Sequence, residues 1–145
     1  MYKHILIATD GSELAERAAS QGLELAKLLE AKATAVTVTE PWTAVVTGEA
    51  ALGFPPGDYE TWVVEAATPV LGRIAEKAKA AGVDCATVHL KDHFPDEGIV
   101  AVAKDEGCDL IVMASHGRRG LARLLLGSVA SKVLTLSPVP VLICR

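Results

Sequence analysis

The chain has 145 residues, a length that suits one domain, and half of its residues are hydrophobic, which is enough for a full core. The net charge of −4 disfavours a general nucleic-acid binder, and no apolar run approaches the roughly 18 residues that a membrane span needs. The start of the chain lacks the features of a signal peptide, and the three cysteines show no CxxC spacing, so we expect a cytoplasmic protein with buried free thiols and neither disulfide framework nor zinc site.

The first half of the chain alternates apolar runs with helical patterns. Residues 3–9 read as a buried strand, and apolar residues then recur at helical spacing from Glu13 to Ala31. The β-branched run 33–39 predicts a second strand, which Pro41 ends. Residues 41–57 hold three Pro and three Gly without a clean period, and they predict a long loop that is a candidate lid or partner surface.

Most of the aromatic residues cluster in or beside this predicted loop. They are Trp42, Phe54, Tyr59 and Trp62. We expect their rings to close over the edge of the core.

The second half of the chain predicts six further elements: a helix over 59–81, a strand over 83–90, a helix over 95–106, a strand over 110–114, a helix over 127–136 and a strand over 141–144. Strands that alternate with helices indicate a parallel sheet covered on both faces, with right-handed crossovers. In such sheets ligands bind beyond the carboxyl ends of the strands, which directs attention to Asp10 and to residues 114–128.

Charge is distributed unevenly along the chain, since no acidic residue follows Asp109. The basic residues beyond it are Arg118, Arg119, Arg123, Lys132 and Arg145. This unbalanced basic end suggests an anionic ligand nearby, although a solvated basic face would give the same pattern.

The segment from Ala114 to Ser128 carries the clearest chemical signal. It leaves a strand, makes a Gly-bearing turn and enters a helix at Gly127. The N–H groups of a helix's first turn have no internal partners, so phosphate binds well there, and glycine lets the backbone approach a ligand closely. Alternatively, Gly127 is only a turn residue and Ser128 only caps its own helix.

The same segment resembles the nucleotide loop of the universal stress proteins. That motif is Gly, two residues, Gly, nine residues, then Gly followed by Ser or Thr. Gly117, Gly127 and Ser128 match it, whereas Ala114 stands at the first Gly position. The resemblance runs over the whole chain, from the opening KHILIATDGSELAERA to the ending GSVASKVLTLSPVPVLI.

This resemblance implies one domain over residues 1–145. The implied fold is a three-layer α/β/α arrangement, Rossmann-like and of the adenine-nucleotide alpha hydrolase type. Its five-stranded parallel sheet has the strand order 3-2-1-4-5. The implied ligand is ATP or AMP, and Mg²⁺ can accompany ATP. The edge strand near Cys144 is expected to pair across a two-fold axis, which gives a homodimer.

The resemblance also implies residue roles around the nucleotide. Ala8, Thr9 and Asp10 would lie near the ribose and adenine, Val38 would touch adenine through its backbone, Met113 and Ala114 would flank base and sugar, Gly117, Gly127, Ser128 and Val129 would hold phosphates, and His116 and Arg118 would lie beside the phosphate loop.

Several of these residues allow a second interpretation. Asp10 and Glu13 have the spacing of a helix N-cap with its reciprocal acid. His116 fits a loop-ordering hydrogen bond better than a catalytic base, and Arg118 can simply be exposed to solvent. The methyl group of Ala114 can be absorbed, at some loss of nucleotide affinity.

Other catalytic and metal motifs are missing from the sequence. There is no P-loop, no GxGxxG after the first strand and no GxSxG. His89 and His93 are four residues apart, but at a strand end rather than on a helix, which disfavours a metal site. We therefore expect a nucleotide-binding regulatory or stress-response protein with an unidentified protein partner. The alternatives are an interaction module that has lost nucleotide and, third, a slow ATPase.

Overall fold

The structure is a computed structural model that describes residues 1–118 and 125–145. Arg119 and Arg123, which the charge pattern singled out, lie outside the described residues. The elements are β1 (His4–Ala8), α1 (Glu13–Leu29), β2 (Lys32–Val38), α2 (Trp42–Val45), α3 (Ala50–Gly53), α4 (Pro56–Ala81), β3 (Cys85–Leu90), α5 (Pro95–Asp105), β4 (Leu110–Ala114), α6 (Ser128–Leu136) and β5 (Val141–Cys144).

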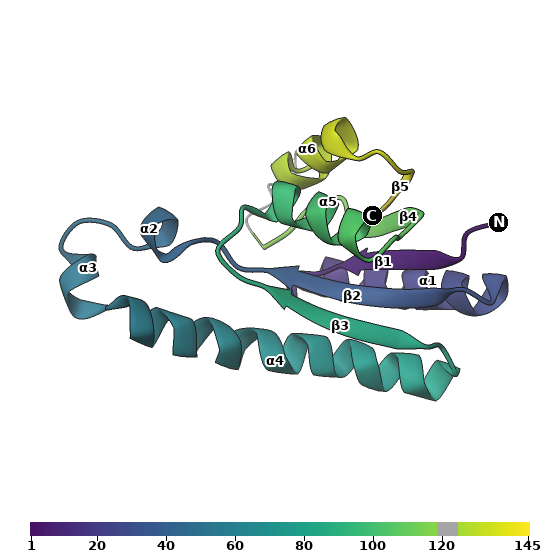
Figure 1. Ribbon diagram of the computed structural model, residues 1–145, viewed down its shortest axis with the longest axis horizontal. Helices are drawn as coiled ribbons and strands as arrows, with labels where there is room; N and C mark the ends of the chain where they lie inside the picture. The colour runs from purple at the N-terminus through teal and green to yellow at the C-terminus, as the bar shows by residue number, and fades with distance from the viewer. Residues whose placement is uncertain (119–124) are drawn as a thin grey trace.

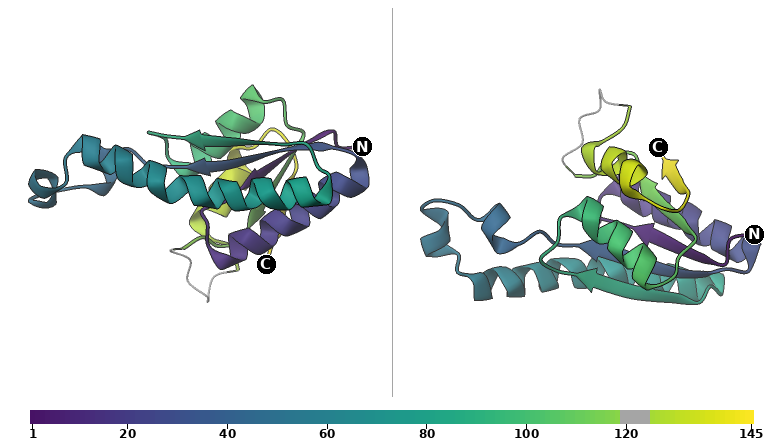
Figure 2. Two further views of the ribbon diagram at one scale, coloured as in Figure 1. Left: turned by 90° about the horizontal axis from the view of Figure 1, so that it is seen from below. Right: turned by 45° about the horizontal axis from the view of Figure 1, so that its top comes forward.

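The strands form one five-stranded parallel sheet in the order β3-β2-β1-β4-β5, which confirms the predicted fold class and strand order. α1 and α4 cover one face, and α5 and α6 cover the other (Figures 1 and 2). Because all strands run the same way, their carboxyl ends meet at one edge of the sheet.

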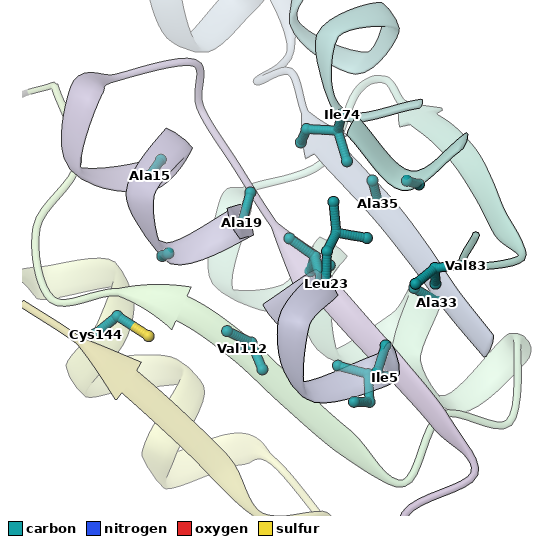
Figure 3. Close-up of a cluster of buried hydrophobic side chains, with 14 of the residues drawn as sticks. Ile5, Ala15, Ala19, Leu23, Ala33, Ala35, Ile74, Val83, Val112 and Cys144 are labelled. Atoms are coloured by element: carbon teal, nitrogen blue, oxygen red, sulfur yellow. The ribbon is translucent and has the colours of Figure 1, made fainter. Parts of the chain in front are cut away.

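The central strand β1 is buried on both sides. Ile5 and Ile7 join the cluster beneath α1 and α4, whereas Leu6 and Ala8 join the cluster beneath α5 and α6. This alternation follows from the two-residue period of a strand. Figure 3 shows the first cluster, in which Leu23 of α1 and Ile74 of α4 lie over the sheet.

The prediction that residues 41–57 form a long loop is wrong in part. They contain α2 and α3, and α4 begins at Pro56, three residues before the predicted start. We call residues 41–66 the arm. Figure 1 shows that the arm extends past the carboxyl ends of the strands. α4 then ends as predicted at Gly82, which adopts a left-handed φ of 74°.

The aromatic side chains of the arm also differ from expectation. Instead of closing over the edge of the main core, three of the four build a separate cluster. Val46, Tyr59 and Val63 are buried in it, with Trp42 and Phe54 packed against them. The arm thus has a small core of its own.

All three cysteines were expected to be buried thiols, and the structure confirms this for two of them. They are Cys108 and Cys144, whereas Cys85 is half-buried. Burial, with a contribution from Glu106, raises the pKa of Cys108 to about 11, so this thiol is inert at neutral pH.

We expect buried His4 to make the fold sensitive to mild acid. Its Nε2 lies 2.7 Å from Thr34 Oγ1, and burial, followed by the charge of Lys32, lowers the pKa of His4 below 6.5. As the pH falls, His4 is therefore protonated in the unfolded chain before it is protonated in the folded chain. The free energy of unfolding falls as the pH drops below about 6.5. Urea unfolding at pH 7.5 and 5.5 measures the effect.

His4→Gln is expected to reduce this loss, since glutamine keeps a polar atom near Thr34 without titrating. His93→Gln is the control, because His93 is exposed. An equal pH dependence in wild type and His4→Gln would contradict the assignment.

Candidate functional site

A cleft of about 540 Å³ opens at the carboxyl ends of the strands. The ends of β1, β2 and β4, the first turns of α5 and α6, and the inner side of α4 contribute its walls. All twelve residues that the sequence singled out line this cleft: Ala8, Thr9, Asp10, Val38, Met113, Ala114, His116, Gly117, Arg118, Gly127, Ser128 and Val129. The structure brings them together, and their roles toward a nucleotide stay predictions.

Asp10 ties two turns of the cleft together. Its Oδ1 accepts a 3.0 Å hydrogen bond from the Ser12 backbone N–H, and its Oδ2 accepts a 2.8 Å hydrogen bond from the Arg118 backbone N–H. The predicted capping role of Asp10 is wrong. Ser12 is the N-cap of α1 instead, and its hydroxyl accepts a hydrogen bond from the Ala15 N–H at 3.3 Å.

Gly117 is the residue against which the Asp10 carboxylate rests. A methyl group added at Gly117 would lie 2.5 Å from Asp10 Oδ2, which is too close for any side chain. A methyl group at Gly11, whose φ is +80°, would lie 2.9 Å from an Arg118 guanidinium nitrogen. The turns after β1 and β4 are therefore packed directly on each other.

Gly127 brings the start of α6 against the end of β4. Its N–H donates a 2.7 Å hydrogen bond to the Ser115 carbonyl oxygen. A methyl group at Gly127 would lie 2.8 Å from that oxygen and 3.3 Å from His116 Cα. Gly127 has a φ of −70°, so the lack of a side chain, not a special backbone angle, is what this position uses.

The first turn of α6 carries neither an acidic residue nor a side-chain cap. Gly127 is the N-cap, which overturns the alternative that Ser128 caps its own helix. Ser128 is exposed at the first helical position and lines the cleft. The N–H groups at this end of α6 are therefore available to an anion.

The two ring nitrogens of His116 have different surroundings. Its Nδ1 lies 3.0 Å from Ser115 Oγ, which fits the expected loop-ordering hydrogen bond. Its Nε2 is buried and has no hydrogen-bond partner among the described residues. His116 lines the cleft, but its Nε2 is itself shielded from solvent.

The residues at the strand ends contribute an apolar floor. Ala114 pairs in register with Cys144 and belongs to the core cluster beneath α1 and α4, so the sheet has room for its extra methyl group. Met113 and Ala8 belong to the opposite cluster. Val38 is packed closely by α5, since a methyl group at Gly98 would lie 2.8 Å from Val38 Cγ1.

Sequence reasoning missed one whole wall of the cleft, which comes from α4. Its residues are Tyr59, Trp62, Val63, Ala66, Ala67 and Val70. Their spacing of three and four residues is the signal that could have identified this stripe. Lys132 belongs to the basic end noted in the sequence, but it was not among the predicted site residues. It lines the cleft four residues after Ser128, on the same side of α6.

Charged side chains are unevenly distributed around the cleft. Lys132 lines it on α6, Arg118 and Asp10 line it where the turns after β4 and β1 meet, and Glu40 and Asp96 line it near the ends of β2 and β3. The Glu40 charge adds to burial in raising the pKa of Tyr59 above its usual value of 10. An anionic group is therefore favoured at the α6 end.

Over residues 1–118 and 125–145, no group of three His, Cys, Asp or Glu side chains is placed to hold a metal ion. His89 instead bonds Thr39 Oγ1 at 2.7 Å, and His93 Nδ1 lies 2.7 Å from the Lys91 carbonyl oxygen. Among the helices in the described part of the chain, none has the length and apolar character to cross a bilayer.

Several known proteins are similar to nearly the whole of this chain. The chain is 34% identical to Universal stress protein YxiE of Bacillus subtilis, and the match covers 100% of both chains. The solved structure of MJ0577, from Methanocaldococcus jannaschii, superposes with a TM-score of 0.82 at 30% identity, over 99% of this chain and 96% of that one. A universal stress protein solved in complex with cAMP gives a TM-score of 0.71 at 26% identity, over 99% and 97%.

The family model described as "Universal stress protein family" matches residues 1–145. With a full-length match to that model and curated relatives at 34% identity, this chain belongs to the universal stress protein family.

Proposed function

We propose that this protein is a cytoplasmic regulatory or stress-response homodimer that binds an adenine nucleotide, ATP or AMP, in the cleft. The observation that carries the proposal is the open first turn of α6, which faces the cleft without an acid or a side-chain cap of its own. Phosphate groups bind well at such a helix end. Gly127 and Ser128 would hold them, with Arg118 and Lys132 nearby.

The base would lie toward the ends of β1 and β2. Ala8, Val38 and Met113 give this part of the cleft an apolar surface, and the backbone beyond Val38 can exchange hydrogen bonds with the base edge. The related structure that holds cAMP supports a ligand with an adenine base and a phosphate.

Mg²⁺ would bind to the phosphates of ATP rather than to protein side chains. The described residues at the α6 end include one carboxylate, Asp10, and both of its oxygens already accept backbone hydrogen bonds. We therefore assign no protein side chain to a metal ion.

A second candidate is an interaction module of the same fold without nucleotide, which Ala114 at the motif's first Gly position leaves open. A slow ATPase is the third candidate. A turnover faster than about 1 per second, the ordinary range for enzymes, would favour it over a regulatory binder.

Thermal unfolding with and without ligand separates the first two candidates. For micromolar affinity, 1 mM ATP adds about 4 kcal/mol to the free energy of unfolding, which raises the melting temperature by about 10 °C. GTP at the same concentration controls for general phosphate binding. An unchanged melting temperature with ATP and with AMP would favour the interaction module.

The homodimer is proposed at the outer edge of β5. This strand ends the sheet, and its Leu142 is 41% exposed. An unpaired strand edge with an apolar side chain invites a partner strand. Leu142→Lys is expected to convert the dimer to monomer at high micromolar concentration in a sedimentation run.

The matched control is Leu28→Lys, which changes an 81% exposed leucine on α1 and should leave the dimer intact. A wild-type protein that sediments only as monomer would contradict the proposed dimer.

A further inference from the structure

Two large aromatic side chains in the cleft stay open to solvent. Trp62 of α4 is 55% exposed and Phe94 is 47% exposed, and both line the cleft. Covering exposed aromatic surface in a concave site removes apolar area from water, and a flat ring is the group that covers it best.

The buried cluster of the arm leaves Trp62 more than half exposed. The cluster inside the arm is made by Val46, Tyr59 and Val63 with Trp42 and Phe54 among its neighbours, and Trp62 is not a member. The other tryptophan, Trp42, behaves differently. Its Nε1–H donates a 2.7 Å hydrogen bond to the Phe54 carbonyl oxygen, and it does not line the cleft.

Trp62 is nevertheless held in position. Its ring centroid lies 6.1 Å from that of Tyr59 and 6.3 Å from that of Phe54, with interplanar angles of 32° and 76°. The Tyr59 hydroxyl donates a 2.6 Å hydrogen bond to the Glu40 carbonyl oxygen, just beyond β2. The arm is thereby tied to the sheet edge, which presents the Trp62 ring to the cleft in a preorganised position.

Phe94 is unexplained by its local structure. It is the N-cap residue of α5, and no side-chain hydrogen bond caps this helix. Large apolar residues are poor N-caps, because they offer the first turn no acceptor. Its position is better explained by what it presents to the cleft.

The arm and α6 border different parts of the cleft. Tyr59 attaches the arm to the end of β2, whereas Gly127 attaches α6 to the end of β4. A nucleotide with its phosphates at α6 therefore has its base on the side of the arm. Within the described residues, Arg118 and Lys132 are the arginine and lysine side chains that line the cleft, and both are assigned to the phosphate end.

We propose that Trp62 and Phe94 are the base-stacking residues of this nucleotide site, so that they determine affinity for the base but not for the phosphates. This inference rests on the proposed function, because it takes the phosphates to lie at α6. Stacking of a base on an aromatic side chain is sequence-tolerant and strong enough for its loss to be measured as a clear drop in affinity.

Calorimetric titrations of wild type and Trp62→Leu with ATP and with inorganic tripolyphosphate test the inference. Trp62→Leu keeps apolar bulk but removes the aromatic ring. ATP should bind about 5- to 100-fold more weakly to the variant. Tripolyphosphate, which has no base, should bind both proteins equally. Trp62→Phe should recover most of the ATP affinity, and Phe94→Leu should behave like Trp62→Leu.

Two further variants exclude a purely structural role. Leu52→Ala changes an 89% exposed residue of the arm that does not line the cleft, and its ATP affinity should be unchanged. Trp42→Phe leaves Trp62 as the one tryptophan, since the chain has two. ATP should then change the tryptophan emission, and tripolyphosphate should not.

The outcomes separate this inference from the proposed function. If wild type binds neither ATP nor AMP, both are overturned. The stacking inference alone is overturned if Trp62→Leu and Phe94→Leu bind ATP as well as wild type does. It is also overturned if the variants lose affinity for tripolyphosphate as much as for ATP.

Discussion

Gly127→Ala is expected to destabilise the fold and to weaken nucleotide binding. The new methyl group would lie 2.8 Å from the Ser115 carbonyl oxygen and 3.3 Å from His116 Cα. Both atoms belong to the backbone, so no side chain can rotate away, and the start of α6 must move. We expect a loss of about 1–3 kcal/mol in the free energy of unfolding, as for other overpacked sites.

Displacement of α6 also moves the N–H groups that would hold the phosphates. ATP affinity should therefore fall at least about tenfold, or 1.4 kcal/mol. Urea unfolding measures the first effect, and calorimetry measures the second.

Gly72→Ala provides a matched control on α4. Gly72 is exposed, lies inside the helix and has no atom within 4 Å of an added methyl group. Alanine is favoured over glycine in a helix, so this change should stabilise the fold by about 0.5–1 kcal/mol and leave binding unchanged. If Gly127→Ala binds ATP like wild type, the first turn of α6 is not the phosphate site.

Ser128→Asp is expected to change stability and binding in opposite directions. A carboxylate in the first turn of α6 is favourable for the helix, by about 0.3–1 kcal/mol, because the helix end carries partial positive charge. The same carboxylate repels a bound phosphate at close range, and we expect ATP affinity to fall about 10- to 100-fold.

Ser128→Asn separates charge from shape, since asparagine has nearly the same size as aspartate without its charge. It should bind ATP much better than Ser128→Asp. The difference between the two variants should shrink at high salt, because exposed charges are screened. Equal affinity for both variants at low salt would show that phosphate does not bind beside Ser128.

The sheet could be predicted closely because its strands are short apolar runs between clear breaks. β4 and β5 have the predicted bounds, and Gly82 ends α4 as expected. α2 and α3 could not be predicted, because helices of four residues are not stable by themselves. They exist because Trp42 and Phe54 pack on the first turns of α4, and such contacts between separate segments leave no local period in the sequence.

The residues of the candidate site were predicted by motif and by their place at the strand ends. The error at Asp10 has a local cause, since Ser12 is an equally good cap and lies one position before the helix. Asp10 is then free to bond the Arg118 N–H, a partner 108 positions away that no local pattern reveals. The wall from Tyr59 to Val70 was missed because its aromatic residues were assigned to the neighbouring loop.

Titration of nucleotide-stripped protein with Mg-ATP and with AMP by calorimetry tests the central claim most directly. We predict binding at micromolar strength, about −8 kcal/mol, for at least one of the two nucleotides. The titration is repeated at a second temperature to exclude a binding enthalpy near zero. If no heat of binding is measured at either temperature up to millimolar ligand, the nucleotide site is contradicted and the interaction module is favoured.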